Sequence, residues 1–466
     1  MQRNILIFSL SSLLFLGGCS LKPDLNVPSM ELPISEENTL HVNATWWENF
    51  GDASLNLLVA EALQSNYDIK LSALRILKAK QAYGLSDATL YPSLNANAGS
   101  TRQQTSAETY QHNRSLYTDN AMALNLSYEI DFWGKLSSQA ESNWELYLAS
   151  ASAAQTVKNT LIHDTISSYL NLVSLSVRLN IVDETIQTYK AAYEFRLKQH
   201  ERGTINELLV AQAKAQYLST LTTQSTLLES KKLQENALLL LLGKSPKAFF
   251  EANATRINAL PKAITIPKGI PSSILESRPD IQEALFTLKS KNALIGVEKA
   301  AYFPSISLTG SYGQQSESLD NILQSSANRW SFGPSLSVPI FDFGRIKARV
   351  SISETELKIA LESYEQTVKK AYKEISDALG RHAILKEKVR THEDEIAAYE
   401  RSLHISTKRF NAGSISYLEV LDAQKGLLMA RLNATTSQQA YLVSQAELFK
   451  ALGSGWNEKN LLGDKQ

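Results

Sequence analysis

Two kinds of hydrophobic pattern follow one another along the chain, and the succession occurs twice. Segments 67–90 and 281–301 carry apolar residues at spacings of three and four, which predicts amphipathic helices. Each is followed by stretches in which apolar and polar residues alternate, which predicts strands with one apolar face. The clearest stretch is AMALNLSYEIDF at 121–132, and the others are SLNANAGST, PSISLTGSY and RWSFGPSLSVPIF. We therefore expect two β-hairpins, within 93–132 and 304–343.

Helical periodicity continues for an unusual distance after each pair of predicted strands. Tracts 134–200 and 344–410 contain no proline, a residue that disrupts helix interiors. At 1.5 Å per residue, each tract would form a helix of ~100 Å, longer than a compact soluble domain requires. Each tract ends at a glycine, after which a second periodic segment follows. The sequence thus predicts two antiparallel helical hairpins with coiled-coil-like seams, within 133–245 and 344–452.

The two halves of the chain are similar in sequence as well as in pattern. Asp68 corresponds to Asp280 at an offset of 212 residues, and Gly203 corresponds to Gly413 at an offset of 210. The offset changes by single residues along the repeat, which is typical of a duplicated unit. Helices are expected at 46–92 in the first copy and at 278–303 in the second.

The number of predicted strands limits how they could be used. Half-buried strands of a soluble sheet are the commoner origin of such alternation, but segments of about ten residues also suit tilted membrane strands. A sheet in lipid cannot leave its edges unpaired, and the smallest spanning barrels have about eight strands. Four strands in one chain cannot close such a barrel. If they lie in a membrane, the barrel is shared among copies, and three copies would supply twelve strands.

Composition excludes several classes of protein. Lysine plus arginine and aspartate plus glutamate each number 47, so the formal net charge is zero and nucleic acid is not an expected partner. A single cysteine permits no intramolecular disulfide, and the seven histidines show no metal-ligand spacing. We find no motif with the spacing of a catalytic site, and we expect neither an enzyme nor a resident cofactor.

The N-terminus contains the cysteine in an informative context. The run ILIFSLSSLLFLGG has the length of a signal-peptide core and is too short to span a bilayer. Leu16-Gly17-Gly18-Cys19 resembles the bacterial lipoprotein signal. This resemblance implies a signal peptide at 1–18, followed by N-acyl and S-diacylglycerol groups on Cys19 and an extended segment at 19–45. Ser20 is compatible with sorting to the outer membrane.

Several motifs together resemble the TolC-like outer membrane factors, in particular the OprM-like lipoprotein branch that serves RND efflux systems. They are WWENFGDASLNLLVAEAL, YPSL and YFPSIS, DFWGK and DFGR, RGTINELL and AGSISYLEVLDAQ, and ALGSGW. The resemblance extends over the whole chain. It implies a mainly α protein with a membrane β-barrel, in which a homotrimer builds a 12-stranded barrel and a periplasmic α-barrel of helical hairpins. It also implies an equatorial linker at 246–277, an equatorial tail at 453–466, and partnership with a periplasmic adaptor and an inner-membrane RND-type pump.

The same resemblance assigns candidate site residues. In the family, an aspartate and a basic residue three positions later help to close the periplasmic end, and here they are Asp422 and Lys425. Residues three apart lie on one helix face. Phe410 is the third candidate gate residue; it stands where relatives often carry tyrosine, and it lacks the hydroxyl that could form a hydrogen bond in the gate. The equivalent residues of the first half, Gln212 and Ala215, carry no charge.

The tips of the two predicted hairpins are the expected docking points for the adaptor. They comprise Arg202, Gly203 and Thr204 in the first half and Ala412, Gly413 and Ser414 in the second. A simple helix-terminating turn accounts for the same glycines and is compatible with docking.

One alternative remains open at this point. The same fold also serves as the outer membrane conduit of type I protein secretion, although the lipoprotein signal and the WWENFGD opening favour efflux of small molecules. Four methionines and one acylated cysteine give no sign of a copper or silver path.

Overall fold

The computed structural model describes residues 21–27, 45–108, 116–245, 259–264 and 278–453. Cys19, the signal peptide, most of the linker at 246–277 and nearly all of the tail at 453–466 lie outside these ranges. The described elements are η1 (Trp46–Phe50), α2 (Ala53–Ser65), α3 (Tyr67–Ala88), β1 (Ser93–Gln104), β2 (Leu116–Ile130), α4 (Lys135–Glu201), α5 (Glu207–Leu241), α8 (Pro279–Ala300), β3 (Ser305–Ser316), η2 (Leu319–Asn321), η3 (Ser325–Ala327), β4 (Asn328–Ser337), α9 (Arg345–Asn411) and α10 (Tyr417–Ala451).

The chain divides into two compact units, and each combines pieces of both sequence halves. The first unit contains 1–30, 75–151 and 283–365, and the second contains 31–74, 152–282 and 366–466. The duplication seen in the sequence is therefore not a division into two domains. Equivalent segments of the two halves instead contribute to the same unit.

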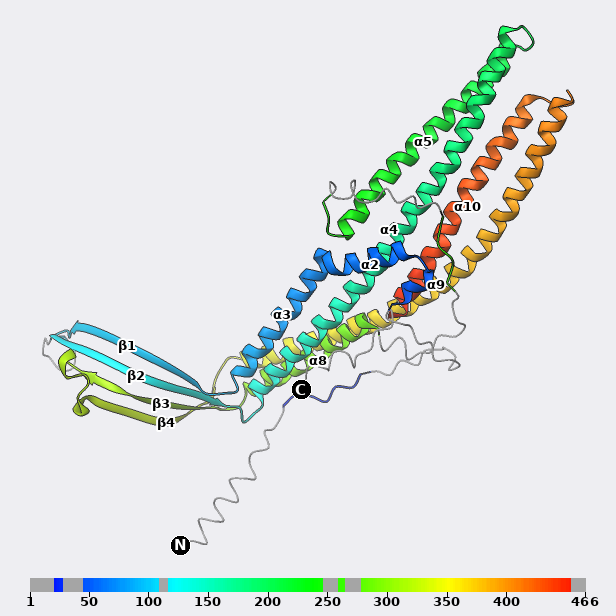
Figure 1. Cartoon of the computed structure of the whole chain (residues 1–466). Helices are drawn as coiled ribbons and strands as arrows, with labels where there is room; N and C mark the ends of the chain where they lie inside the picture. Colours follow the sequence, from blue (N-terminus) through cyan, green and yellow to red (C-terminus); the bar gives the residue numbers. More distant parts are fainter. Residues whose placement is uncertain (1–20, 28–44, 109–115, 246–258, 265–277, 454–466) are drawn as a thin grey trace. The chain divides into compact units, whose positions relative to one another are not determined.

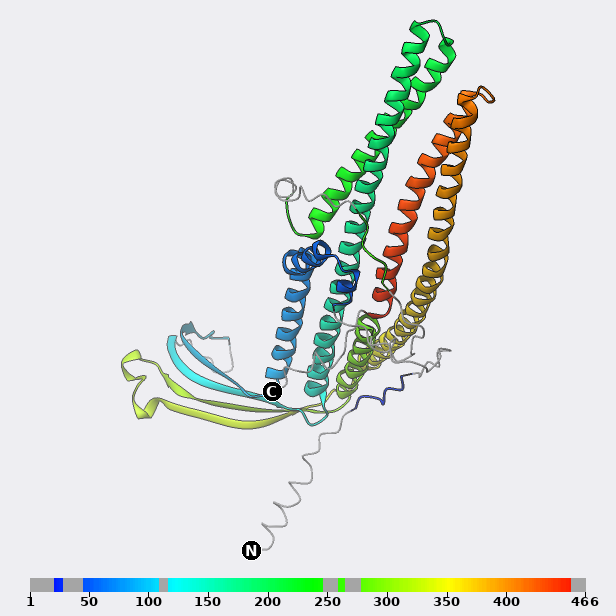
Figure 2. The ribbon, with the colours of Figure 1, turned by 45° about the vertical axis from the view of Figure 1, so that its right-hand side comes forward.

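The first unit contains an antiparallel sheet of four strands in the order β1-β2-β3-β4 (Figure 1). The strands lie within the two predicted hairpin ranges. β1 pairs with β2 in the first hairpin and β3 pairs with β4 in the second, and the pairing of β2 with β3 joins the two hairpins. β1 and β4 are the edges of this sheet, which is curved along its strands (Figure 2).

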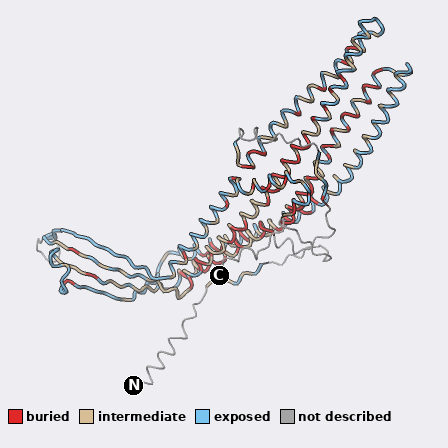
Figure 3. Tube along the Cα trace, viewed as in Figure 1, coloured by how far each residue is buried: buried red, intermediate tan, exposed pale blue. Residues whose placement is uncertain are grey.

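One face of the sheet is apolar across the strands, as the alternation predicts. One rung brings together Leu124, Tyr312 and Trp330, and another on the same face brings together Ile130, Ile306 and Leu336. Leu124, Tyr312, Trp330 and Leu336 are exposed in the single chain, and exposed positions predominate along the strands (Figure 3). An apolar face of this kind requires an apolar environment that the single chain does not provide.

The opposite face carries mainly hydroxyl and amide side chains. Towards the ends of the strands farthest from the helices, the Gln315 amide donates to both carboxylate oxygens of Asp119, at 2.8 and 2.9 Å, and its oxygen accepts from Arg329. The three side chains lie on β2, β3 and β4 at diagonal positions of the register, so this chain of polar contacts crosses three strands. A sheet with one apolar and one polar face is typical of a wall between lipid and water.

An aspartate fixes each transition from strand to long helix. The Asp131 carboxylate accepts hydrogen bonds from the amides of Leu136 and Ser137 at the start of α4. Asp342 accepts from the amides of Gly344 and Ile346 at the start of α9, and these bonds hold the pKa of its carboxyl below the usual value. Both residues satisfy amides that a helix N-terminus would otherwise leave without partners.

The second unit contains the greater part of two helical hairpins side by side, α4 from residue 152 with α5 (hairpin one) and α9 from residue 366 with α10 (hairpin two) (Figures 1 and 2). The two outgoing helices have 67 residues each and the two returning helices have 35 each. Apolar contacts join the hairpins, because Leu428 and Leu432 of α10 pack with Leu175, Leu179 and Val182 of α4. The buried positions follow these facing sides (Figure 3).

The aromatic motif WWENFGD, which begins at Trp46, packs against the core of the second unit. Trp46 stacks on Phe449 of α10, with ring centroids 4.6 Å apart. Asp52 caps α2 and also accepts a hydrogen bond of 2.6 Å from the Tyr169 hydroxyl on α4. The WWENFGD motif is thus a packing element that ties α2 to both hairpins. None of the helices in the described ranges combines the length and the apolar character that crossing a membrane would need.

Candidate functional site

The two hairpin tips have the same backbone geometry. Gly203 and Gly413 have φ of 69° and 72°, in the left-handed region that side chains other than glycine rarely adopt. The amides of Thr204 and Ser414 each donate a 2.9 Å bond five residues back, to Gln199 and Arg409. The glycine amides also donate, to the carbonyl oxygens of His200 and Phe410. These two hydrogen bonds per tip satisfy the last carbonyl groups of the outgoing helix.

The side chains around both tip glycines are accessible. Arg202, Thr204, Ala412 and Ser414 are exposed, and open space surrounds the position where either glycine would carry a Cβ. The six residues predicted to dock the adaptor, 202–204 and 412–414, therefore form two similar turns that are exposed at the ends of the hairpins.

Asp422 and Lys425 lie on consecutive turns of α10, close to its N-terminus. Both side chains are exposed, while their neighbours Leu421 and Ala423 are buried. Within the described residues of this single chain, neither charged group takes part in an ion pair or hydrogen bond. The pair is thus directed away from the packed side of α10, and its assignment to a gate stays a prediction.

Phe410 has a packing contact in place of a hydroxyl bond. Its ring lies 5.3 Å from the ring of Tyr417, between centroids. Both belong to an apolar group, here called the tip cluster, that joins the two hairpins. Its members are Tyr193, Leu209 and Ala213 from hairpin one and Leu403, Phe410, Tyr417, Val420 and Leu421 from hairpin two.

A charged residue that the sequence analysis did not single out lies against this cluster. Arg196 of α4 has its guanidinium carbon 4.9 Å from the Phe410 ring centroid and 4.6 Å from that of Tyr417. Its position in the second half is occupied by Ser406, 210 residues later. The sequence signal for Arg196 is this difference between the two halves, in which one half carries a charged residue and the other does not. Asp422 and Gln212 differ in the same way.

A close helix approach occurs next to Lys425. A Cβ built on Gly426 would lie 2.2 Å from a ring carbon of Tyr399 on α9. The absent side chain therefore lets α10 pack directly against the Tyr399 ring, which fixes α9 and α10 as one body just behind the charged pair.

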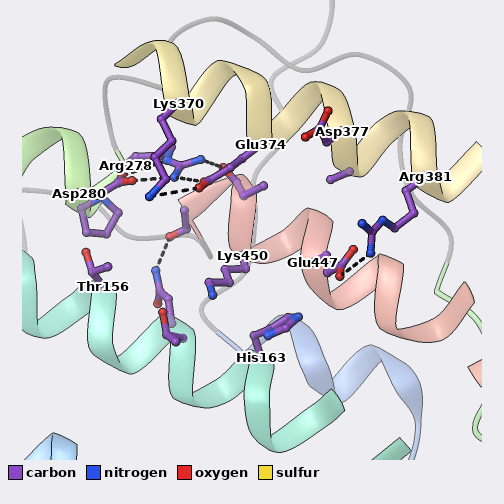
Figure 4. A pocket seen from close by; sticks show the side chains of 16 residues that line it. Thr156, His163, Arg278, Asp280, Lys370, Glu374, Asp377, Arg381, Glu447 and Lys450 are labelled. Carbon is purple, nitrogen blue, oxygen red and sulfur yellow. Dashed lines mark hydrogen bonds and ion pairs between the residues drawn. The ribbon is translucent and has the colours of Figure 1, made fainter. Parts of the chain in front are cut away.

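A polar hollow of about 490 Å³ lies at the other end of the hairpins in the second unit (Figure 4). Its lining includes four basic and four acidic side chains: Arg278, Lys370, Arg381 and Lys450, with Asp280, Glu374, Asp377 and Glu447. Arg278 donates to Asp280 and Glu374, and Arg381 forms an ion pair of 3.2 Å with Glu447. Mutual pairing of the charges favours a structural role over a ligand site.

Metal binding gains no support from side-chain clustering. Within the described ranges, no group of three or more histidine, cysteine, aspartate or glutamate side chains is placed to hold a metal ion.

Comparisons with known proteins agree with this architecture. A family profile described as outer membrane efflux protein matches residues 58–244 and 270–454, one match in each half. The cation efflux system protein CusC of Escherichia coli is 32% identical over 451 residues, covering 95% of this chain and 97% of the relative. The probable outer membrane lipoprotein SilC of Salmonella typhimurium is 32% identical, covering 97% and 99%.

A relative that is named for the export of a different compound has nearly the same sequence identity to this chain. The toluene efflux pump outer membrane protein TtgC of Pseudomonas putida is 30% identical, covering 100% of this chain and 98% of the relative.

Solved structures have the same fold. The Campylobacter jejuni CmeC outer membrane channel superposes with a TM-score of 0.90 at 27% identity, covering 95% of this chain and 98% of that one. A crystal structure of CusC superposes with a TM-score of 0.85 at 32% identity, covering 93% and 100%. The predictions of a TolC-like fold and an outer membrane location are confirmed, and the chain belongs to the outer membrane efflux protein family.

Proposed function

We propose that three copies of this chain form the exit duct of a tripartite efflux system, with a 12-stranded barrel in the outer membrane and a helical tunnel in the periplasm. The observation that carries the proposal is the four-stranded sheet. It has an apolar face, a polar face and two edge strands, β1 and β4. In lipid those edges need partners, and a neighbouring copy would supply them.

The dimensions of the apolar face support a place in the membrane. The apolar positions of β2 extend from Met122 to Ile130, eight steps along the strand. At ~3.3 Å per step this is ~26 Å of strand, and a tilt of ~40° leaves ~20 Å of height, most of the ~25 Å apolar band of outer membrane barrels. The polar face would then line the water-filled interior. Cys19 would add a lipid anchor at the periplasmic side of the same membrane.

Asp422 and Lys425 are proposed to hold the periplasmic end of the tunnel closed. Their exposure on α10 in a single chain supports a partner on a neighbouring copy. Three-fold symmetry would place three such pairs around a narrow opening, where partial loss of water strengthens charge interactions. Phe410 supports this region by packing, since it lies in the tip cluster next to Tyr417.

The gate proposal is tested by single-channel recording. The purified trimer carrying Asp422→Ala and Lys425→Ala should conduct more current in a planar bilayer than the unmodified trimer. A matched variant with Gln212→Ala, at the corresponding position of hairpin one, serves as the control. Equal conductance of the double variant and the unmodified protein would contradict the gate assignment.

The exposed turns at the tips are proposed to bind a periplasmic adaptor, which would connect the duct to an inner-membrane pump of the RND type. The uncovered surroundings of Gly203 and Gly413 support this, because an incoming helical hairpin could approach the backbone closely. Similarity to efflux proteins supports small-molecule export over the type I secretion alternative. The proposed function includes no catalysis and no resident cofactor.

Cargo choice is proposed to lie in the pump and adaptor. Relatives named for cations and for toluene are similar to this chain at nearly equal identity, 32% and 30%. A deletion strain tested against drugs, detergents and metal ions would identify the exported class.

A further inference from the structure

Arg196 occupies a distinctive position between the two hairpins of the second unit. It lies on α4, seven residues before the tip glycine of hairpin one, yet its guanidinium faces two aromatic rings of hairpin two. Those rings belong to Phe410 at the end of α9 and Tyr417 at the start of α10. One side chain of hairpin one thus contacts both helices of hairpin two at their shared end.

The geometry is that of a cation held against aromatic faces. The guanidinium carbon lies 4.9 Å from one ring centroid and 4.6 Å from the other, within the ~6 Å over which such attraction is significant. Arg196 also donates a 2.8 Å hydrogen bond from Nη1 to the Gln199 side chain, which fixes the direction of the guanidinium. The side chain is half-buried, so water weakens the attraction less than at an open surface.

The contact lies at the tip cluster, so a movement of hairpin two relative to hairpin one would disturb it. Tyr417 is buried and lies five residues before Asp422 on the same helix. Moving the start of α10 away from α4 would withdraw Phe410 and Tyr417 from Arg196 and would expose the apolar side chains beneath. Lateral separation of the hairpins therefore requires the loss of this contact.

We propose that Arg196 is the positioning residue that latches hairpin two to hairpin one in the closed channel, through cation–π contact with Phe410 and Tyr417. The inference rests on the proposed gate at Asp422 and Lys425 and adds a second restraint within each chain. The charged pair would join neighbouring copies, whereas the latch joins the hairpins of one copy. Ser406 replaces the arginine in the other half, so each chain holds one latch.

The test compares variants of purified trimers in planar bilayers. Arg196→Met keeps the length of the side chain but removes its charge, and it should raise the open probability about tenfold. Arg196→Lys keeps a charge without the planar group and should give an intermediate value. Arg409→Ala is the matched control, because Arg409 is an exposed cation one residue before Phe410. It should behave as the unmodified protein.

Phe410 tests the same contact from the opposite side. Phe410→Tyr keeps the ring and should leave the channel closed, whereas Phe410→Leu removes it and should raise the open probability. If the two side chains act on each other, Arg196→Met combined with Phe410→Leu should raise the open probability by less than the two single changes together, with the remaining Tyr417 contact accounting for what Arg196→Met still adds. Full additivity, or equal open probability of Arg196→Met and the unmodified trimer, would overturn the proposal.

The Asp422→Ala, Lys425→Ala trimer is recorded in parallel. If it opens while Arg196→Met and Phe410→Leu stay closed, the latch is wrong and the gate stands. If neither that trimer nor the Arg196 variants differ from the unmodified protein, the proposed gate itself fails. Trimer content on gels confirms that each recorded variant is assembled.

Discussion

Asn66 and Arg278 occupy corresponding positions in the two halves of the chain, and each caps the helix that returns from a hairpin tip. The Asn66 amide donates 2.9 Å to the carbonyl oxygen of Leu241, the last residue of α5. The Arg278 guanidinium donates 2.8 Å to the carbonyl oxygen of Ala451, the last residue of α10. Both donors are buried. Both halves therefore contain a side-chain hydrogen bond to the last carbonyl of the returning helix, but asparagine donates it in the first half and arginine in the second.

Replacing Arg278 should destabilise the second unit. Arg278→Ala would remove the cap on Ala451 and leave Asp280 and Glu374 without their shared cation (Figure 4). Both carboxylates are partly exposed and can regain water, so we expect a loss of about 2 kcal/mol in the free energy of unfolding. The melting temperature of the detergent-solubilised protein measures the effect.

Arg381→Ala is the matched control for this change. Arg381 lines the same hollow, but its side chain is 60% exposed in its ion pair with Glu447. Its removal should cost less than ~0.5 kcal/mol. Equal effects of the two substitutions would show that the buried fork of Arg278 has no special role.

The tip glycines allow a test that separates backbone strain from surface contact. Gly203→Val and Gly413→Val place a β-branched residue at positive φ, where it costs ~1–2 kcal/mol, although the added atoms meet open space. Asparagine tolerates this conformation. If docking depends on the turn geometry, both valine variants should lose drug resistance while Gly203→Asn and Gly413→Asn largely retain it. Trimers should form in all four.

The outcome with asparagine decides between two explanations. Loss of resistance in the asparagine variants as well would show that the adaptor needs the bare glycine surface. Full resistance in the valine variants would mean that these turns do not carry the docking.

Hydrophobic periodicity predicted the long helices and the strands because these features depend on regular spacing over many residues. The predicted tract 134–200 corresponds to α4 at Lys135–Glu201, and the alternation around Met122 gives the apolar face of β2. The contact of Arg196 with Phe410 was beyond this reasoning. It depends on how α4 and the end of α9 meet, and those residues are separated by 214 positions in the sequence.

The division into two compact units was equally hidden from the sequence. Periodicity identifies each half as a repeat, but the burial that assembles a unit comes from contacts between the halves, such as Leu428 of α10 against Leu179 of α4. The family resemblance supplied Asp422 and Lys425, because two exposed charges on a helix carry no signal of their own.

His382 should make the second unit less stable in acid. Burial, and then the nearby Lys386 cation, hold the pKa of this imidazole below its usual value of 6.5. The unfolded chain therefore binds the proton first as pH falls below ~6.5, so the free energy of unfolding decreases from there until the folded-state pKa is passed. The ring stacks on Tyr441, with centroids 5.0 Å apart, and links α9 to α10.

A phenylalanine at this position would remove the titration and keep the stacking. Melting temperatures of His382→Phe should fall less between about pH 7.5 and pH 5 than those of the unmodified protein. His404→Phe, at an exposed position of α9, is the control. An unchanged pH slope in His382→Phe would assign the acid sensitivity to other groups.

Two helical glycines should respond in opposite directions to the same substitution. Gly380 of α9 has open space around its Cβ position, so Gly380→Ala should stabilise the protein by ~0.5–1 kcal/mol through helix propensity. Gly426 of α10 meets the Tyr399 ring, and Gly426→Ala should destabilise it by ~1–2 kcal/mol, because the half-buried ring must move. Adding Tyr399→Ala should recover part of that loss, since the methyl group then has space. Thermal unfolding of Gly380→Ala, Gly426→Ala, Tyr399→Ala and the Gly426→Ala, Tyr399→Ala double variant measures these changes. A stabilising Gly426→Ala would mean that α9 and α10 are not in close contact behind Lys425.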